Sequence, residues 1–322
     1  MQVIVQNSGL RPAFGMSNSA SSSDSPPVAV IGAGAVGTAL ARRLVQAGYE
    51  VRAVVSRTPA DAEMLAEQVG GATAADRVAA LPSDVRLVVL CVPDDALATV
   101  AAQLAATEHP WPQTVVAHTS GRHPASVLSP LADAGAPTLS FHPLQTFAHD
   151  TPPDAFDGIA IAIEGGEEGV VVGRVLADAL GAHPVVLSAD DKARYHCAAA
   201  LASNGLAALM GTVQEVLAST SLQEADPADL FGPLVEQTWA NVRERGPEGA
   251  LTGPVARGDR DTVAAHLEAL SDTTPHLVPL YAALSTEMAR MAVRRGRLAP
   301  DEARPLFKQL REAVQSAQES PR

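Results

Sequence analysis

The chain has 322 residues, 47% of them hydrophobic, which suits two domains with large buried cores and excludes global disorder. A formal net charge of −13 and a pI near 5.1 argue against nucleic acid or an anionic membrane as partner, and no uninterrupted apolar run reaches membrane-spanning length. Cys91 and Cys197 lack metal-ligand spacing, so no metal site is expected. With both thiols expected to be buried, the composition favours a cytoplasmic protein.

The N-terminal stretch before the first strand is rich in serine, asparagine and proline, a composition that buries too little apolar surface to fold. It also lacks the basic and apolar regions of a secretory signal. We therefore predict a flexible tail over residues 1–26.

The first predicted strand, Val28–Ile31, runs directly into three glycines at G-x-G-x-x-G spacing, which are Gly32, Gly34 and Gly37. A helical pattern from Thr38 to Ala47 follows, and then a second strand, Val51–Val55. In a dinucleotide-binding unit the first glycine allows the tight turn, the second lets the backbone approach a pyrophosphate, and the third lets the helix pack on the strand. The helix N-terminus offers free N–H groups and the positive end of its dipole to the phosphates. The sequence therefore predicts a bound dinucleotide.

The residues at the end of the second strand indicate which dinucleotide is bound. A site for NAD usually places Asp or Glu there, to accept a hydrogen bond from the ribose 2′-hydroxyl. This chain has Ser56, Arg57 and Thr58 instead, and an arginine pairs well with a 2′-phosphate. We predict NADPH as the cofactor. Its predicted contacts are Gly32, Gly34, Ala35, Val36, Gly37, Ser56, Arg57 and, after a later strand, Val92 and Pro93.

Strands and helices continue to alternate beyond the second strand. Helices are expected near 60–69 and 170–180, and Asp94 or Asp95 is the expected N-cap of another helix. The further predicted strands are 71–73, 86–92, 114–117, 136–140, 159–164 and 185–188. Strands vanish from residue 189. The fold class is thus α/β, a doubly wound, mostly parallel Rossmann sheet over residues 27–188, followed by an all-helical C-terminal domain over residues 189–322.

Polar residues follow two of these strands, at the sheet edge where such folds bind ligands. Ser120 is expected to hydrogen-bond a substrate carboxylate or the nicotinamide carboxamide, and His142 to orient substrate or relay a proton. For both residues a purely structural role, in a turn or as a loop anchor, is an equal alternative.

The first helical segment after residue 189 carries a polar stripe. At 100° per residue, Lys192, His196 and Ser203 fall within an arc of about 40°, and Asn204 follows directly after Ser203. Such groups are costly to bury unless they are paired, and desolvation would lower the pKa of Lys192 toward the range suited to protonating a carbonyl oxygen. The alternative is that Lys192 lies at the surface and Asn204 packs against a neighbouring helix.

A Gly-Pro loop over residues 251–259 interrupts the later helices. Asp259 is the expected N-cap of the helix that contains His266, while Arg257 either holds a substrate carboxylate or ties the loop down.

Together these motifs resemble a bacterial family with a Rossmann-like domain followed by a C-terminal domain of unknown function. The motifs are the glycine loop, His118-Thr-Ser-Gly121, Ser140-Phe-His-Pro-Leu-Gln-Thr-Phe147, the Lys192 to Asn204 segment and the 251–259 loop. That family is related to the 6-phosphogluconate, β-hydroxyacid and pyrroline-carboxylate enzymes. Some relatives are assigned as an alternative ketopantoate reductase. The resemblance implies a homodimer formed through the helical domain.

The β-hydroxyacid branch of that superfamily carries a catalytic lysine with an asparagine four residues on. Here His196 stands four residues after Lys192, and the nearest asparagine is Asn204. The resemblance therefore leaves the substrate open.

The sequence predicts an NADPH-dependent oxidoreductase that reduces a small anionic 2-oxo acid of the ketopantoate kind. Lys192 would polarise the carbonyl, with Ser120, His142, His196 and Asn204 as the further catalytic candidates. An imine reductase of the pyrroline-carboxylate type is one alternative, because its substrate arrives already protonated. A non-catalytic NADPH-binding sensor or scaffold is the other.

Overall fold

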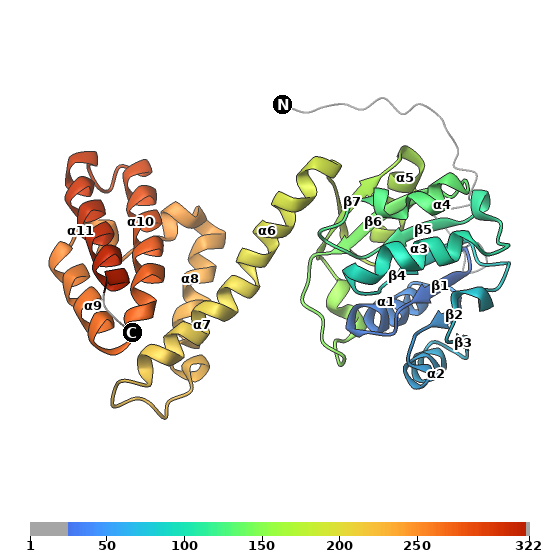
Figure 1. The fold of residues 1–322 in the computed structure, drawn as a ribbon, viewed down its shortest axis with the longest axis horizontal. Coiled ribbons are helices and arrows are strands. Elements are labelled where there is room, and N and C mark those ends of the chain that lie inside the picture. The colour runs from blue at the N-terminus through green and yellow to red at the C-terminus, as the bar shows by residue number, and fades with distance from the viewer. Residues whose placement is uncertain (1–24, 320–322) are drawn as a thin grey trace. The chain divides into compact units, whose positions relative to one another are not determined.

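The computed structural model describes residues 25–319 of the chain (Figure 1). The predicted tail falls outside the described residues as far as residue 24. Two compact units follow one another along the chain, the first ending at Leu201 and the second beginning at Ala202. The sequence puts the domain boundary near residue 189, where the strands end. The first unit continues to Leu201 because helix α6 (Lys192–Ala202) buries the side chain of Lys192 against it.

The first unit is built on an eight-stranded sheet with the order β3-β2-β1-β4-β5-β6-β7-β8. Strands β6 and β7 pair antiparallel, and the other neighbouring strands of the sheet pair parallel. The fold class predicted for this part is confirmed. The strands are β1 Val28–Ile31, β2 Val51–Val55, β3 Thr73–Ala75, β4 Leu87–Leu90, β5 Val115–His118, β6 Thr138–Pro143, β7 Ala160–Gly165 and β8 His183–Val186.

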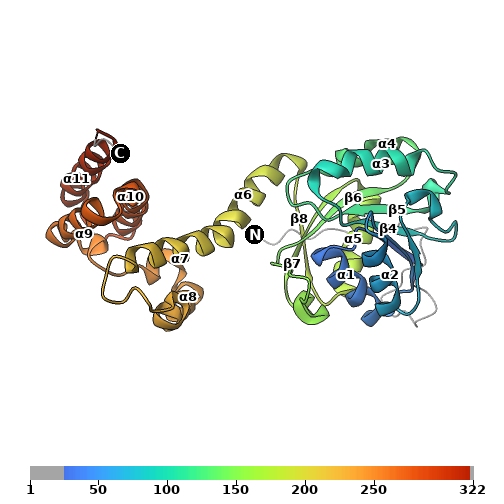
Figure 2. The same ribbon diagram turned by 60° about the horizontal axis from the view of Figure 1, so that its bottom comes forward.

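Helices cover both faces of the sheet. Helices α1 (Ala35–Gln46), α2 (Pro59–Gln68) and α5 (Glu167–Ala179) lie on one face, and α3 (Leu97–Ala105) and α4 (Ser129–Asp133) on the other (Figure 2). Because successive side chains of a strand point to opposite faces, each central strand contributes side chains to the hydrophobic cores on both faces of the sheet.

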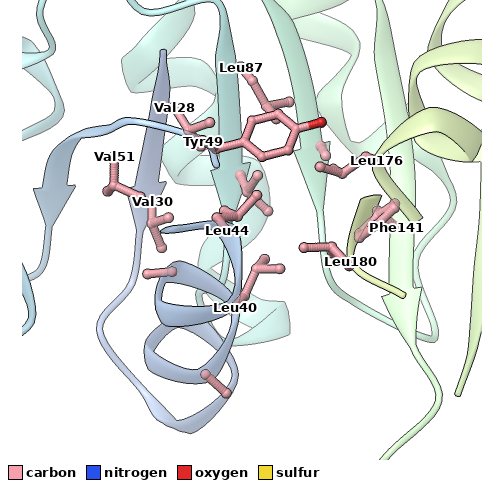
Figure 3. Packing of buried hydrophobic residues seen from close by; sticks show 14 of the residues in the cluster. Val28, Val30, Leu40, Leu44, Tyr49, Val51, Leu87, Phe141, Leu176 and Leu180 are labelled. Atoms are coloured by element: carbon pink, nitrogen blue, oxygen red, sulfur yellow. The ribbon is translucent and has the colours of Figure 1, made fainter. Parts of the chain in front are cut away.

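Strand β1 illustrates this division. Val28 and Val30 pack with Leu40 and Leu44 of α1 (Figure 3), whereas Ile31 belongs to the core beneath α3. All four residues of β1 are buried, as a central parallel strand requires.

The predicted strands 71–73 and 185–188 each lie two residues from β3 and β8 as the structure has them, and the predicted cap at Asp94 or Asp95 was wrong. The third strand begins at Thr73 because Gly70 and Gly71 both have positive φ, 97° and 89°, and form the turn before it. Neither Asp94 nor Asp95 caps a helix by its side chain: both lie in a short 3₁₀ turn, Asp94–Ala96, and α3 begins after it without a side-chain cap.

The second unit is helical, as predicted. Its helices are α7 Asn204–Leu217, α8 Pro227–Ala250, α9 Arg260–Thr273, α10 Val278–Arg294 and α11 Pro300–Glu319. Helices α9, α10 and α11 share one core, which includes Val263, Val278 and Leu306. Asp259 caps α9 as predicted, because its Oδ1 accepts from the Thr262 N–H at 3.1 Å.

Helices α7 and α8 contribute little to that core. No residue of α8 is buried, and Leu217 is the buried residue of α7. Among the described residues, the helical stretch 189–217 is long and apolar enough to cross a membrane, by length and composition alone, and its most apolar window is not buried. These helices therefore present apolar surface that the chain itself leaves uncovered.

The glycine loop yields a matched pair of stability predictions. A Cβ on Gly37 would lie 1.9 Å from the Gly32 carbonyl oxygen, whereas a Cβ on Gly34 would meet no atom within 4 Å. We expect Gly37→Ala to lower the free energy of unfolding by about 2 kcal/mol or more, and Gly34→Ala to leave it nearly unchanged. Urea unfolding followed by fluorescence of the buried Trp111, in a Trp239→Phe background, measures this unit alone. Equal stability of the two variants would contradict the packing described.

Candidate active site

The glycine loop has the geometry that dinucleotide binding requires. Gly32 has a φ of 106°, and a Cβ there would lie 2.3 Å from the Cys91 carbonyl oxygen, so the turn accepts only glycine. Gly34 is the N-cap residue of α1 and faces open space. The N–H groups of the first turn, at Ala35, Val36 and Gly37, have no partner within the helix. A group of backbone N–H donors without helical partners therefore lies at the end of β1.

The loop after β2 carries an arginine without an ion-pair partner among the described residues. The Oγ of Ser56 accepts from the Thr58 N–H at 3.3 Å, which turns the chain sharply here. Arg57 is exposed, and no carboxylate among the described residues forms an ion pair with it. Its guanidinium is therefore available to a ligand.

Hydrogen bonds connect the loops that follow β1, β4 and β5. The Cys91 N–H donates to the Ile31 carbonyl at 2.7 Å, and the Thr119 N–H donates to the Leu90 carbonyl at 3.1 Å. Val92 and Pro93 come directly after Cys91. The carboxyl ends of the three strands thus form one continuous edge, from the glycine loop to Ser120.

Lys192 lies buried at this edge, where it is only 1% exposed. Its Nζ donates to the Ser120 carbonyl oxygen at 3.0 Å and to the hydroxyl of Ser140. Ser140 is itself buried in β6, beside His118 of β5. Burial lowers the pKa of Lys192 to about 8, opposed by the charges of Glu164 and Asp94. The lysine thus titrates near neutral pH.

The neighbouring histidines are neutral. His118 accepts from the Ser120 N–H at Nδ1 (3.2 Å) and lies 3.3 Å from the Pro124 carbonyl through Nε2, which indicates the Nε2–H tautomer. Burial, together with the Lys192 charge, lowers the pKa of His118 to about 4. The same causes lower the pKa of His142 to about 4. Lys192 is therefore the cationic group of this cluster at neutral pH.

Tyr195 and His196 approach His142 from α6. The Tyr195 hydroxyl lies 2.9 Å from Nδ1 of His142, and burial raises the pKa of Tyr195 to about 12. The ring of His196 stands edge-on to that of His142, with centroids 6.2 Å apart. A Cβ on Gly121 would lie 2.7 Å from one ring and 2.8 Å from the other, so the loop after β5 needs glycine there.

The structure gives the predicted catalytic residues different surroundings. The hydroxyl of Ser120 accepts from the N–H groups of Arg122 and His123, which closes a turn, and it is the carbonyl of Ser120 that contacts Lys192. His142 lies inside β6 rather than in a loop. His196 is exposed, although it is one turn from Lys192.

The predicted polar stripe, from Lys192 to Asn204, does not lie on a single helix. Helix α6 ends at Ala202, and Ser203 has a φ of −104° and a ψ of −71° before α7 begins. Asn204 belongs to the second unit, where its side chain is exposed, and so is Arg257. Their proposed contacts with substrate stay predictions. Cys197 is exposed, so the expectation that both thiols are buried was wrong.

Sequence reasoning gave no role to Ser140, Glu164 or Tyr195. Ser140 and Glu164 are direct partners in the β6–β7 pairing, and Glu164 is buried with its Oε2 accepting from the Ala125 N–H at 2.6 Å. The sequence places Ser140 and Glu164 within two predicted strands, and a polar residue within a buried strand can indicate a functional site. That the two residues lie opposite each other depends on the register of the antiparallel pair β6–β7, which the sequence does not show.

Two family models match the chain. Residues 16–143 match the Rossmann-like domain, and residues 159–288 match a domain of unknown function, DUF2520. The chain carries a Rossmann-like domain followed by a C-terminal DUF2520 domain. No curated protein matches it.

Solved structures share the fold. A Bacteroides fragilis protein described as a candidate NADP oxidoreductase is 27% identical, with a TM-score of 0.68 over 83% of this chain and 98% of its own. A Thermotoga maritima protein is 24% identical, with the same TM-score over 82% and 99%. An imine reductase from Myxococcus stipitatus, in complex with NADP+, is 21% identical, with a TM-score of 0.55 over 90% and 95%. The last two show the fold alone.

Removing the buried charge is expected to stabilise the first unit. At pH 7 folding takes the Lys192 ammonium out of water, which lowers the stability of the wild type. Between about pH 8 and 10.5 the unfolded chain holds a proton that the folded chain has lost, so the stability of the wild type rises with pH over this range. Lys192→Met keeps the side-chain volume, and Ser140 still donates to the Ser120 carbonyl. We expect Lys192→Met to raise the free energy of unfolding at pH 7 by about 1 to 3 kcal/mol, with the gap narrowing toward pH 10. Urea unfolding at both pH values measures this, and a variant less stable than wild type at pH 7 contradicts it.

Proposed function

We propose that this protein is an NADPH-dependent oxidoreductase that reduces the carbonyl group of a small 2-oxo acid. The observation that carries the proposal is the buried Lys192, held by Ser120 and Ser140 at the same strand edge as the glycine loop. A lysine with its pKa lowered toward neutrality is a suitable proton donor. In sheets of this kind, ligands bind at this edge.

The residues present fit a dinucleotide. Gly34 leaves open the space beside the N-terminus of α1, and the free N–H groups there suit the pyrophosphate. Gly32, Ala35, Val36 and Gly37 would complete that contact, with Val92 and Pro93 along the neighbouring strand end. When bound, the nicotinamide supplies the hydride that reduces the carbonyl carbon.

Arg57 supports NADPH over NADH. Its unpaired guanidinium stands after β2 beside Ser56 and Thr58, with no carboxylate at the strand end to accept from a 2′-hydroxyl or to repel a 2′-phosphate. The Bacteroides fragilis protein, similar in fold and 27% identical, is described as a candidate NADP oxidoreductase.

Lys192 would act as the acid. Its two hydrogen bonds, to a backbone carbonyl and to a hydroxyl, hold Nζ in place, and they leave the third donor position for the substrate oxygen. His118 and His142 stay neutral, so they do not repel the ammonium. The positive charge also favours a small anionic substrate, of which a branched 2-oxo acid such as ketopantoate is the one we propose.

An imine reductase is the second candidate. An imine arrives already protonated, so it has no need of a lysine acid, and the buried Lys192 is the observation against it. The same residue argues against a non-catalytic sensor, because a pure binding protein gains nothing from an ammonium held at a strand end.

The cofactor assignment is tested by the binding of NADPH and NADH to the wild type and to Arg57→Ala. Loss of one charge-assisted phosphate contact should weaken NADPH binding by about 10-fold or more and leave NADH binding unchanged. Calorimetric titration measures both, with Arg77→Ala, an exposed arginine of the same unit, as the control. Equal loss of both nucleotides would contradict the role of Arg57, and no binding of either would contradict the proposed function.

The role of Lys192 is tested by turnover. We expect Lys192→Met to lower kcat for 2-oxo acids by about 100-fold or more, because the thioether of methionine has no proton to donate. In the wild type, kcat should fall as the pH rises through the pKa of Lys192, about 8, because the donating ammonium is lost. Full turnover of an imine by Lys192→Met, with none of a 2-oxo acid by the wild type, would favour the imine reductase.

We also propose that the protein is a cytoplasmic homodimer formed through α7 and α8. Their exposed apolar side chains include Leu206, Leu209, Leu230, Leu234 and Trp239, the last two 63% and 62% exposed. Charged residues such as Asp229 and Glu236 interrupt the apolar residues of α8, which suits a protein partner with a polar rim better than lipid. A second copy carries the same face and is the occupant we propose.

Leu234→Glu tests the dimer. Placing a charge in the apolar face should shift the mass measured by light scattering from dimer to monomer at micromolar concentration. Met64→Glu is the matched control, since Met64 is an exposed apolar residue on α2 of the first unit. A wild-type monomer, or an unchanged dimer in Leu234→Glu, would contradict the proposed interface.

A further inference from the structure

Glu164 lies behind the lysine that the proposed function makes the acid. It is a buried residue of β7 and stands directly opposite Ser140 in the antiparallel pairing of β6 and β7. Directly opposed residues of such a pair point to the same face of the sheet, about 5 Å apart at Cβ. Ser140 is the residue whose hydroxyl accepts from Lys192, so Glu164 is one side chain removed from the ammonium.

The carboxylate also fixes the loop on the other side of Lys192. Its Oε2 accepts from the Ala125 N–H at 2.6 Å, at the start of the 3₁₀ turn Ala125–Leu128. The loop that leads into this turn contains Ser120, whose carbonyl is the second acceptor of Lys192. Glu164 therefore contacts both segments that hold the lysine. It lies opposite Ser140 in the pairing with β6, and it accepts a hydrogen bond from the end of the loop that follows β5.

The charges around Lys192 come from several elements. Glu164 of β7 and Asp94, which follows β4, are the carboxylates that act on it, and neither forms an ion pair with it. His118 of β5 and His142 of β6 are neutral near pH 7. On α6 itself, Tyr195 is uncharged, and His196 is exposed. Of the two carboxylates, Glu164 is the buried one and has the larger effect.

We propose that Glu164 is a positioning residue of this site, whose carboxylate keeps Lys192 in its ammonium form and holds the Ser120 loop against it. The proposal deepens the proposed function and rests on it. Burial alone lowers the pKa of a lysine, so the proton leaves at a lower pH than it would in water. A carboxylate one side chain away raises that pKa again. Glu164 would thereby set the upper pH at which the acid stays charged.

The chain offers a direct way to measure this. Lys192 and Lys308 are its two lysines, and Lys308 is exposed on α11. In a Lys308→Arg background, full-length protein made with ε-¹³C-lysine has a single lysine resonance, whose shift reports the protonation of Lys192 without cofactor or substrate.

Glu164→Gln removes the charge and keeps an oxygen that accepts from the Ala125 N–H. We expect it to move the Lys192 titration midpoint, near pH 8 in the parent, down by about one pH unit. Glu164→Asp keeps the charge and should restore a midpoint close to the parent value. Glu167→Gln, which removes an exposed carboxylate from the first turn of α5, is the matched control and should leave the midpoint unchanged.

An unchanged midpoint in Glu164→Gln overturns the inference, and so does an equal shift in Glu167→Gln. Activity separates this inference from the proposed function. If the midpoint moves and the decline of kcat with pH moves with it, both stand. If the midpoint moves and the kcat profile does not follow, Glu164 positions Lys192 as inferred, but Lys192 is not the acid. If the Lys192 midpoint is the same in Glu164→Gln as in the parent, and the decline of kcat with pH follows that midpoint, Lys192 is the acid but the inference about Glu164 is wrong.

Discussion

Keeping a buried ammonium group at the carboxyl edge of a mostly parallel sheet is the constraint around which the first unit is arranged. The desolvation of Lys192 is offset by two acceptors from different strands, the Ser120 carbonyl after β5 and the Ser140 hydroxyl in β6. Both contacts are made from the first turn of α6, where Lys192 is the buried residue, and the sheet unit extends through this helix to Leu201. Burial, together with the same charge, lowers the pKa of His118 and of His142, so both stay neutral. A group that costs stability to bury is retained where its chemistry is useful.

The glycine loop and the lysine cluster are parts of one edge rather than separate sites. Gly32 packs on the Cys91 carbonyl at the end of β4, and Thr119 after β5 donates to Leu90 at that same end. The parallel order β1-β4-β5-β6 brings all four strand ends into sequence along the sheet. A nucleotide held at the first loop would extend toward the strand ends that carry the lysine. This continuity would let one domain hold both the proposed dinucleotide and the proposed acid.

Sequence alone predicted the features that local chemistry determines. The apolar run Val28–Ile31 predicted a buried strand, and Gly32 and Gly37 stand where the turn and the helix contact exclude a side chain, whereas Gly34 faces open space. Lys192 was predicted because a lysine in an apolar helix needs a buried partner. Glu164 and Tyr195 were missed because their places depend on the β6–β7 register and on how α6 packs. Ser120 contributes its carbonyl rather than its hydroxyl, and Asn204 leaves the stripe because the helix breaks at Ser203.

A nucleotide bound at the glycine loop is proposed to reduce a carbonyl compound at this strand edge. The decisive experiment incubates the full-length protein with NADPH stereospecifically deuterated at nicotinamide C4 and with a panel of 2-oxo acids and cyclic imines. Mass spectrometry should then find deuterium on the former carbonyl carbon of a 2-hydroxy acid, transferred from one face of the nicotinamide only. Tight NADPH binding without transfer of deuterium to any of these compounds would contradict this proposal.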